Sequence, residues 1–413
     1  MKNLILNGGY NKKSILFEKG KGDQIYFKGK KLTDLSHCSG SLIFGHNNSI
    51  LVKSLKSYLK NKVSIFSHPN IYAVKFSKLI KEFFPNFQKI VFCNSGTEAV
   101  IKALRISSAT NKKNLIVSVS GSWHGSVGKT LFYSDKNYKP KPISSGLDKE
   151  NKKKIIFIPY NDIEKSKKIL EKHKNKINCL LIEPVQAGLP LENVGSYLKF
   201  LEKFCRKNRI NLIFDEIITG FRTIEGSVQS KYSIKPDITI LGKVSGGGLP
   251  IGLIGINNEV FKKIKKNKLR VFFGGTFSAN SMSSFVGYQT LKYLKSNKTK
   301  LKNLEKKCKY FQENLNKFLN LNDIDAKVYR FQNIIRIIFS RKNIEDKLQR
   351  DFLEREKLYR INLFRDYLFT KKIFYPNNGI IFFSTATSYQ NIKKLLEHSK
   401  NFLKENFSVQ NKK

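Results

Sequence analysis

The sequence predicts an α/β protein whose core is a mostly parallel sheet with helices on both faces. The chain has 413 residues, of which 40% are hydrophobic and 26% are charged. This balance is typical of a globular chain with a sizeable core. Short apolar runs recur along it, and each is followed by a turn containing Gly, Ser or Asn and then by an amphipathic stretch. Such an alternation of strand and helix favours βαβ units.

The first predicted unit runs from a buried strand to a helix. Residues 89–93 (KIVFC) form an apolar run, and residues 94–97 (NSGT) form the turn after it. From residue 98 to residue 110, apolar side chains recur at helical spacing. Residues 115–119 (LIVSV) then predict a second strand, because they are rich in β-branched residues.

The same alternation continues through the middle of the chain. Residues 178–182 (NCLLI) predict a strand that ends before Glu183 and Pro184. An apolar helical face over residues 197–209 leads into a strand over residues 212–214. Two further apolar runs, 237–241 and 251–256, complete the predicted sheet.

After about residue 285 the pattern changes to a smaller α+β unit. Residues 284–296 and 301–321 predict two helices, and residues 334–339 and 379–384 predict two strands. One more helix is expected between these strands and another after Tyr389. Residues 23–32 resemble a hairpin. We therefore predict an amino-terminal arm (residues 1–45) that packs on a carboxyl-terminal small domain (286–413), with a large domain (46–285) between them.

The composition excludes several classes of protein. No apolar run approaches the roughly 18 to 20 residues that cross a bilayer, and the amino end has only three consecutive apolar residues, too few for a secretion signal. The five cysteines form no CxxC pair, and the six histidines show no ligand spacing relative to them. We expect reduced thiols, no metal site and a cytoplasmic location.

The chain is strongly basic, with 77 Lys and Arg against 31 Asp and Glu and a formal net charge of +46. Such a field would attract polyanions or anionic membrane surfaces. The lysines are nevertheless spread from residue 2 to residue 413, and no RNA- or DNA-binding motif accompanies them. We interpret the charge as a compositional bias and expect no nucleic-acid partner; a polyanion-binding protein is the remote alternative.

Residues 94–99 (NSGTEA) link a strand to a helix. Ser95, Gly96 and Thr97 would present backbone N–H groups and a hydroxyl at the helix N-terminus, which is a ready anion site. The alternative is an ordinary helix cap, where Ser and Thr are favoured in any case.

Two charged residues end apolar strands. Burying the charge of Asp215 at the end of a strand costs free energy unless the carboxylate is paired or hydrogen-bonded. Its partner could be a cationic ring nitrogen, or it could cap a helix or form an ion pair with Arg222. Lys243 precedes the three glycines 246–248, which let the backbone approach a ligand closely. A desolvated lysine has a lowered amine pKa and can form a Schiff base, although one lysine in so lysine-rich a chain means little alone.

Residues 122–125 (SWHG) hold the only tryptophan, Trp123, which could stack on a planar ring or fill the core. A phosphate cradle, a stacking face, a carboxylate for a ring nitrogen and a Schiff-base lysine are together the requirements of pyridoxal 5'-phosphate (PLP). The combination is much more specific than its parts.

The motifs NSGTEA, WHG, EPVQ, LIFDEIITGFR, PDITILGKVSGGGLPIG and GGTFSAN follow one another in this order. In these motifs the chain resembles the class III, fold type I, PLP-dependent aminotransferases over residues 8–400. The resemblance implies a seven-stranded, mostly parallel sheet flanked by helices, and a homodimer with shared active sites. It also implies PLP as cofactor and pyridoxamine phosphate as an intermediate.

The resemblance assigns roles to individual residues. Lys243 would form the Schiff base and Asp215 would pair with the pyridine nitrogen. Trp123 and Ile217 would contact the two ring faces, and Thr276 would reach the phosphate of the neighbouring subunit's cofactor. The remaining cofactor-binding residues would be Ser95, Gly96 and Thr97 at the phosphate, His124 beside Trp123, and Gln186 near the phenolic oxygen.

Within the family, residues 8–11 (GGYN), 159–162 (PYND) and 220–239 match the glutamate-1-semialdehyde 2,1-aminomutase branch. That branch places an arginine in its amino-terminal arm for the substrate carboxylate, where this chain has Ile15 with Lys12 and Lys13 nearby. It also usually lacks Gln186, which ordinary transaminases have. An arginine binds a carboxylate through two parallel hydrogen bonds, so its replacement weakens the binding of such a substrate. We therefore favour amino transfer between an amino donor and a carbonyl acceptor, with the aminomutase as the alternative.

Overall fold

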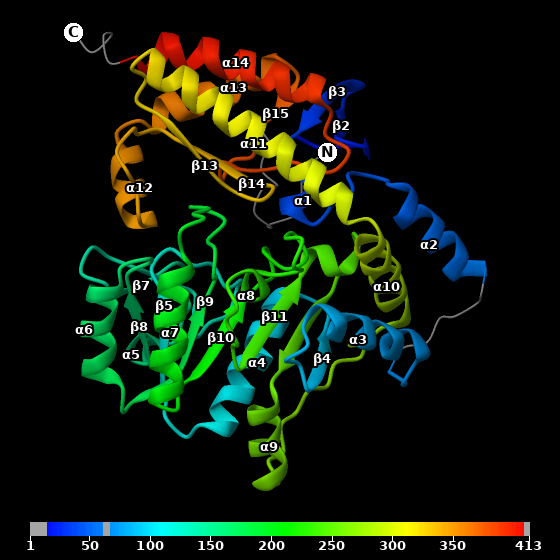
Figure 1. Ribbon diagram of the computed structural model, residues 1–413, viewed down its shortest axis with the longest axis vertical. Coiled ribbons are helices and arrows are strands. Elements are labelled where there is room, and N and C mark those ends of the chain that lie inside the picture. Colours follow the sequence, from blue (N-terminus) through cyan, green and yellow to red (C-terminus); the bar gives the residue numbers. More distant parts are fainter. Residues whose placement is uncertain (1–14, 61–66, 409–413) are drawn as a thin grey trace.

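A computed structural model describes residues 15–60 and 67–408 (Figure 1). Within them the largest sheet has seven strands in the order β4-β12-β11-β10-β9-β5-β8, which agrees with the predicted fold class. The strands are β4 (Lys89–Cys93), β5 (Leu115–Val119), β8 (Ile155–Ile158), β9 (Ile177–Ile182), β10 (Asn211–Asp215), β11 (Ile238–Gly242) and β12 (Gly252–Ile256).

The sheet is parallel except for one strand. β12 pairs antiparallel with both β11 and β4, whereas β8, β5, β9, β10 and β11 pair in parallel. Consequently β4, β9, β10 and β11 all run in one direction and end at the same edge of the sheet. All residues of β5, β9, β10, β11 and β12 are buried, as expected of strands covered by helices on both faces.

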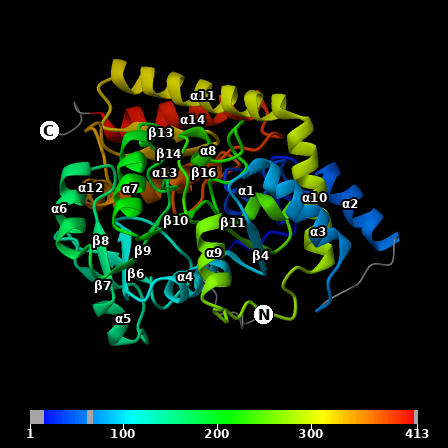
Figure 2. The same ribbon diagram turned by 60° about the horizontal axis from the view of Figure 1, so that its bottom comes forward.

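Helices of this part of the chain surround the sheet (Figures 1 and 2). The helix α4 follows β4 and packs against β11 and β12, and α7 packs against β10. The longer helices are α2 (Ser49–Lys60), α3 (Ile71–Phe83), α4 (Gly96–Thr110), α6 (Ile163–His173), α7 (Gly195–Lys207), α9 (Asn258–Lys266) and α10 (Ser281–Ser296). The short ones are α1 (His37–Gly40), α5 (Lys149–Lys153), α8 (Val228–Lys231) and the 3₁₀ turn η1 (Lys243–Gly246).

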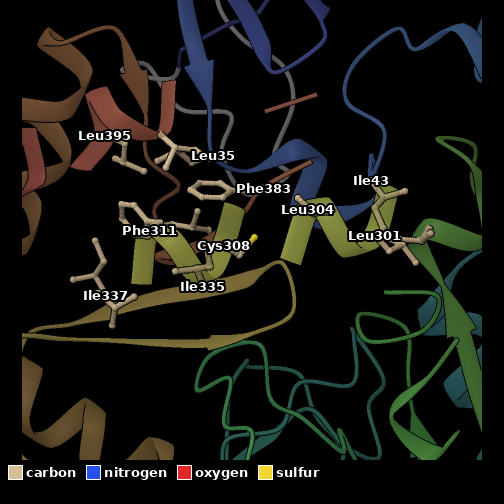
Figure 3. Close-up of a cluster of buried hydrophobic side chains, with 14 of the residues drawn as sticks. Leu35, Ile43, Leu301, Leu304, Cys308, Phe311, Ile335, Ile337, Phe383 and Leu395 are labelled. Atoms are coloured by element: carbon tan, nitrogen blue, oxygen red, sulfur yellow. The ribbon is translucent and has the colours of Figure 1, made fainter. Parts of the chain in front are cut away.

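The carboxyl-terminal part lies above this sheet in Figure 1. It contains a three-stranded sheet in the order β13-β14-β16. Figure 3 shows Phe311 of α11 facing Phe383, with Ile335 of β14 nearby, and the two aromatic rings pack edge to face at 5.7 Å. Its elements are α11 (Lys298–Leu321), β13 (Lys327–Phe331), β14 (Ile334–Ile338), α12 (Lys347–Arg355), α13 (Leu358–Thr370), β15 (Ile373–Phe374), β16 (Ile380–Phe382) and α14 (Tyr389–Phe407).

The amino-terminal segment joins this carboxyl-terminal part. β1 (Lys19–Lys21), β2 (Gln24–Phe27) and β3 (Lys30–Asp34) form an antiparallel ribbon, and β3 pairs in parallel with β15. Leu35 lies in the same buried cluster as Phe311 and Phe383 (Figure 3). The domain division at residues 45 and 285 remains a prediction, and the second boundary falls inside α10, which packs against α2 and α3.

Some elements were not predicted from the sequence. β8 and β13 are apolar strands that we did not identify, and residues 128–155 contain a small hairpin of β6 (Phe132–Ser134) and β7 (Pro140–Pro142). Other predictions lie outside the described residues, namely the amino end, the GGYN match at residues 8–11, and Lys12 and Lys13.

Three predicted absences can be examined only in the described part of the chain. None of its helices combines the length and apolarity needed to cross a membrane. No group of His, Cys, Asp and Glu in it could hold a metal ion. Its five cysteines are free thiols, of which Cys38 alone is exposed.

Candidate active site

A cavity of about 600 Å³ lies at the edge of the sheet where β4, β10 and β11 end. We call one part of its lining the floor, made of Ser95, Gly96, Thr97, Asp215, Ile217 and Lys243. A second part, the amino-terminal wall, consists of Cys38, Ser41, Leu42, Asn47 and Leu51. Lys243 and Asp215 therefore face one cavity, although 28 positions separate them in the sequence.

Lys243 is the first residue after β11 and begins η1. Its φ of 47° lies in the left-handed region, which is strained for a residue with a side chain and is often retained at functional sites. Burial lowers the pKa of the Lys243 amine, and the positive charge of Arg222 lowers it further. The carboxylates of Glu183 and Asp215 act in the opposite direction. The net effect favours the neutral amine, which is the nucleophilic form.

Asp215 ends β10 and is only 3% exposed. One carboxylate oxygen, Oδ2, accepts a hydrogen bond from His124 Nδ1 at 2.8 Å, and the other accepts from the Ile217 backbone N–H at 3.2 Å. His124 Nε2 is buried and has no hydrogen-bond partner within the described residues.

The predicted phosphate cradle is the N-terminus of α4, a helix of 15 residues. The Ser95 hydroxyl caps this helix by accepting from the Glu98 backbone N–H at 3.1 Å. The N–H groups of Gly96 and Thr97 belong to the first turn, where no helical carbonyl precedes them. Ser95 is therefore a helix cap, and the first turn also lines the cavity, so its role as a phosphate site stays a prediction.

Gly125 brings the loop after β5 onto this helix end. Its φ is 73°, and a Cβ atom there would lie 2.4 Å from Thr97 Oγ1. A larger residue would force the two segments apart. Glycine is therefore required at this contact both for its conformation and for space.

Trp123 lines the cavity and is 54% exposed, so it is not a core residue. Its backbone N–H donates to Glu183 Oε2 at 2.8 Å. Glu183 is buried, and burial raises its pKa to about 8, with a further contribution from the negative charge of Asp215. Glu183 is a cavity residue that we did not identify from the sequence, although it begins the EPVQ motif.

Three predicted cofactor-binding residues do not line the cavity: His124, which lies behind Asp215 and hydrogen-bonds to it, and the two residues Gln186 and Thr276. Gln186 is fully buried, and its Nε2 donates to the Ser120 carbonyl at 2.8 Å and to Ser122 Oγ at 3.2 Å. Its Oε1 has no partner within the described residues. Thr276 lies on an exposed loop, where its carbonyl accepts from Ser67 Oγ at 3.1 Å. None of these predicted roles is tested by this geometry.

Comparison with known proteins gives the family. Residues 6–356 match the family model described as "Aminotransferase class-III". The chain belongs to the class III aminotransferase family. Members of this family are PLP-dependent enzymes, so PLP is the cofactor that family membership assigns to this chain, as the resemblance implied.

Two relatives within this family are named glutamate-1-semialdehyde 2,1-aminomutase. The one from Thermodesulfovibrio yellowstonii is 34% identical over 336 residues, which cover 80% of this chain and 78% of the relative. The one from Archaeoglobus fulgidus is 36% identical over 286 residues, which cover 68% of this chain and 67% of the relative.

Solved structures of other proteins have the same fold. An omega-transaminase from Sphaerobacter thermophilus has a TM-score of 0.87 at 23% identity, covering 96% of this chain and 92% of that chain. A glutamate-1-semialdehyde-aminomutase from Pseudomonas aeruginosa PAO1 has a TM-score of 0.84 at 16% identity, covering 95% and 88%. These likenesses extend the family's fold to nearly the whole chain.

The residues of this class III chain fit PLP, although their individual roles remain predictions. The first turn of α4 supplies N–H groups for a phosphate. Asp215 is paired with His124 rather than with Arg222, so one of the sequence-based alternatives for Asp215 is wrong. Gly96 leaves room for a close approach of Ile217, because a Cβ at Gly96 would lie 2.6 Å from Ile217 Cδ1.

The sequence did not reveal the amino-terminal wall. Its residues precede α2 or lie within it, far in the sequence from every residue of the floor. Its backbone is also unusual. Asn47 and the α1 residues His37, Cys38 and Ser39 all have positive φ, a conformation that Asn and His favour but Cys and Ser rarely adopt.

Proposed function

We propose that the protein is a PLP-dependent aminotransferase that moves an amino group from an amino donor to a carbonyl acceptor in two successive half-reactions. One observation carries the proposal. Lys243 and Asp215 line a single cavity together with Ser95, Gly96 and Thr97 at the start of α4. A lysine, a carboxylate and an anion site within one cavity supply the protein groups that PLP chemistry needs.

Each residue of the floor then has a task. PLP, when bound, accepts the electrons that are released when a proton leaves the substrate carbon next to the amine. Lys243 holds the cofactor, and its amine, once free, moves that proton as a general base. Asp215 stabilises a proton on the pyridine nitrogen, and the hydrogen bond from His124 Nδ1 orients the carboxylate.

The amino-terminal wall supports transfer between two substrates. Its five side chains are neutral, and Lys243 is the only cationic side chain among the described lining residues of the cavity. A substrate such as glutamate 1-semialdehyde carries a carboxylate, which proteins bind best with a guanidinium. Two further differences from the aminomutase branch favour an ordinary transaminase: Ile15 stands where that branch has an arginine, and Gln186 is present.

The alternative is the aminomutase itself, an isomerase that makes 5-aminolevulinate. The relatives that are 34% and 36% identical favour it, because both are named glutamate-1-semialdehyde 2,1-aminomutase. The purified enzyme, loaded with pyridoxamine phosphate, should be offered glutamate 1-semialdehyde without any external acceptor. Formation of 5-aminolevulinate would establish the aminomutase, and unchanged substrate would exclude it.

Half-transamination tests the main proposal. The PLP-loaded protein is offered a panel of amines, and the visible absorbance of the Schiff base is followed. We expect one class of amine to bleach it, and a carbonyl acceptor to restore it. Borohydride should fix the cofactor onto Lys243, as detected by peptide mass. A protein that binds no PLP would end the proposal.

We also propose a cytoplasmic homodimer in which Thr276 of one subunit reaches the cofactor phosphate of the other. Equilibrium sedimentation with and without PLP tests the assembly. Weaker PLP binding in Thr276→Val, with an unchanged dimer, would support the shared site. Unchanged PLP affinity would contradict it.

We propose that the charge of +46 serves no nucleic-acid partner. Any retention on DNA should then disappear at about 0.15 M salt, where the Debye length is about 8 Å. Retention that survives this salt concentration would favour the polyanion-binding alternative.

A further inference from the structure

Arg222 is a buried cation without a counterion in the described chain. It is 2% exposed, and no carboxylate of the described residues lies within 4.0 Å of its guanidinium. Burial lowers its pKa to about 9. Its N–H groups instead donate to the carbonyls of Ile218 and Gly40 and, at 3.3 Å, to Asn333 Oδ1. A buried charge without an ion pair is costly and calls for a functional explanation.

The acceptors of Arg222 come from three separate parts of the chain. Ile218 follows β10, Gly40 ends α1 in the amino-terminal segment, and Asn333 lies between β13 and β14. The guanidinium carbon also lies 5.1 Å from the ring centre of Phe382 in β16. Arg222 therefore joins the large sheet, the amino-terminal segment and the carboxyl-terminal sheet at one point.

Gly40 belongs to a turn that needs such support. His37, Cys38 and Ser39 have φ values of 43°, 53° and 53°, and Gly40 has 79°. Three successive non-glycine residues in the left-handed region persist only when surrounding contacts hold them. Besides Arg222, His37 Nδ1 donates to the Phe382 carbonyl at 2.7 Å.

This turn forms the start of the amino-terminal wall. Cys38 and the next residues, Ser41 and Leu42, line the same cavity as Lys243. Arg222 itself is not among the lining residues. It therefore acts on the cavity from outside, through the turn that it holds.

The charge of Arg222 reaches the cavity as well. After burial, repulsion from Arg222 is the largest cause that lowers the pKa of Lys243. Glu183 and Asp215 also act on Lys243, and their negative charges raise its pKa, which opposes the effect of Arg222. Because Arg222 is buried, water and salt screen its charge only weakly.

We propose that Arg222 is a positioning residue, which holds the turn His37–Ser41 as a wall of the substrate cavity and, through its contact with the lining residue Ile218, places a positive charge without an ion pair behind the cavity that contains Lys243. The inference rests on the proposed function, because it treats the cavity as the substrate site. It makes Arg222 a determinant both of substrate fit and of the reactivity of the lysine. These two effects can be separated by substitution.

Three variants separate them. Arg222→Lys keeps the charge but loses the planar fork that reaches several carbonyls. Arg222→Met loses both the charge and the fork. Gly40→Ala keeps Arg222 but disturbs the turn, because a Cβ there would lie 2.7 Å from Arg222 Nη2 at a positive φ.

The first readout is alkylation of Cys38, which needs neither cofactor nor activity. Cys38 is the exposed thiol among the five cysteines, so a thiol reagent at alkaline pH labels it selectively. We expect the labelling rate to change by about threefold or more in all three variants, because the exposure of the thiol depends on the turn that these substitutions disturb. Unchanged labelling in Arg222→Lys and Arg222→Met would overturn the structural half of the proposal.

The second readout is the pH at which the cofactor-free protein forms an imine with pyridoxal, followed by visible absorbance. Imine formation needs the neutral amine of Lys243, so removal of a nearby positive charge moves the midpoint to higher pH. We expect a rise of about one pH unit in Arg222→Met, and no change in Arg222→Lys or Gly40→Ala. Equal midpoints in the two Arg222 variants would overturn the electrostatic half.

The third readout is half-transamination with an active amine. All three variants should raise the amine concentration at half-maximal rate, and only Arg222→Met should also change the pH dependence of the maximal rate. Circular dichroism and thermal melting identify variants that do not fold. If Arg222→Met fails to fold, Arg222→Gln replaces it, because it also removes the charge. A wild-type protein that forms no imine would defeat the proposed function, whereas Cys38 labelling would still report on the wall.

Discussion

The floor and the amino-terminal wall face the same cavity but are built in different ways. Each polar group of the floor lies within a few residues of a strand end: Asp215 is the last residue of β10, and Lys243 directly follows β11. The wall depends on contacts between distant parts of the chain, such as Arg222 with Gly40 and His37 with Phe382. Local backbone geometry thus positions the polar groups of the floor, while tertiary contacts shape the rest of the cavity.

This difference predicts that floor and wall substitutions change different kinetic quantities. Floor variants should lower the rate of chemistry, because they remove groups that act on the reacting atoms. Wall variants should change the binding of the substrate and leave the chemistry nearly intact. Four substitutions test this comparison.

The largest effect is expected for Lys243→Ala. The variant should lose the covalent attachment of PLP and its general base, so half-transamination should slow by at least about 10³-fold. Stopped-flow absorbance measures the rate, and borohydride followed by mass analysis measures the attachment. Lys203→Ala, an exposed lysine of α7, is the control and should behave as wild type. Normal attachment in Lys243→Ala would place the Schiff base on another lysine.

Asp215→Asn comes next. The amide cannot stabilise a protonated ring nitrogen, so we expect a fall of about 10²- to 10³-fold in the half-reaction rate with little change in protein stability. Asp237→Asn is the control, because Asp237 is a half-buried carboxylate that accepts from the Leu212 backbone N–H at 2.8 Å and from Asn257 Nδ2 at 3.0 Å. That control should destabilise the fold without changing the spectrum of the bound cofactor. A slower half-reaction in Asp237→Asn, together with a normal rate but a less stable fold in Asp215→Asn, would contradict the proposed role of Asp215.

Glu183, a cavity residue outside the floor, makes the stability of the protein depend on pH. Burial raises its pKa from 4.5 to about 8, so the folded protein binds a proton that the unfolded chain releases between these values. The free energy of unfolding should therefore fall as the pH rises through this window, by up to about 1.4 kcal/mol per pH unit.

Glu183→Gln should remove this contribution. Urea unfolding of the cofactor-free proteins at several pH values measures it as the difference between wild type and variant. The other buried acids, including Glu216, are present in both proteins and cancel. Parallel stability curves would show that Glu183 is ionised in the folded protein at neutral pH.

The smallest effect is expected in the wall. Cys38→Ala removes one sulfur atom from the cavity lining, so the KM of an active amine should change by about two- to fivefold while kcat stays the same. Ser39→Ala, an exposed neighbour that does not line the cavity, is the control. A kcat that falls as far as in Asp215→Asn would show that the wall takes part in the chemistry.

Sequence patterns predicted the sheet well where strands are short, apolar and followed by a helix. The predictions for β4, β5, β9, β10, β11 and β12 agree with the structure within one or two residues at each end. β8 is equally apolar but was not identified. It comes at the end of a segment, residues 128–155, in which the sequence shows no regular alternation of apolar and polar residues. β13 was missed because Lys327 and Arg330 interrupt its apolar run.

The candidate site shows the same division. The floor could be predicted because each group stands next to a recognisable strand or turn. The position of Gln186 outside the cavity lining could not be predicted, because its side chain turns toward Ser120 and Ser122. The partner of Asp215 could not be deduced either, since His124 and Arg222 were both available in the sequence and only packing selects between them.

The sequence by itself determined the order of strands and helices, the turns that carry Ser95, Asp215 and Lys243, and the family to which the chain belongs. These features depend on residues close together in the chain, where hydrophobic periodicity and turn chemistry act directly. The tertiary structure alone decided which distant segments close the cavity and how the buried charge of Arg222 is accommodated. Such contacts depend on the packing of whole elements, which no local pattern encodes.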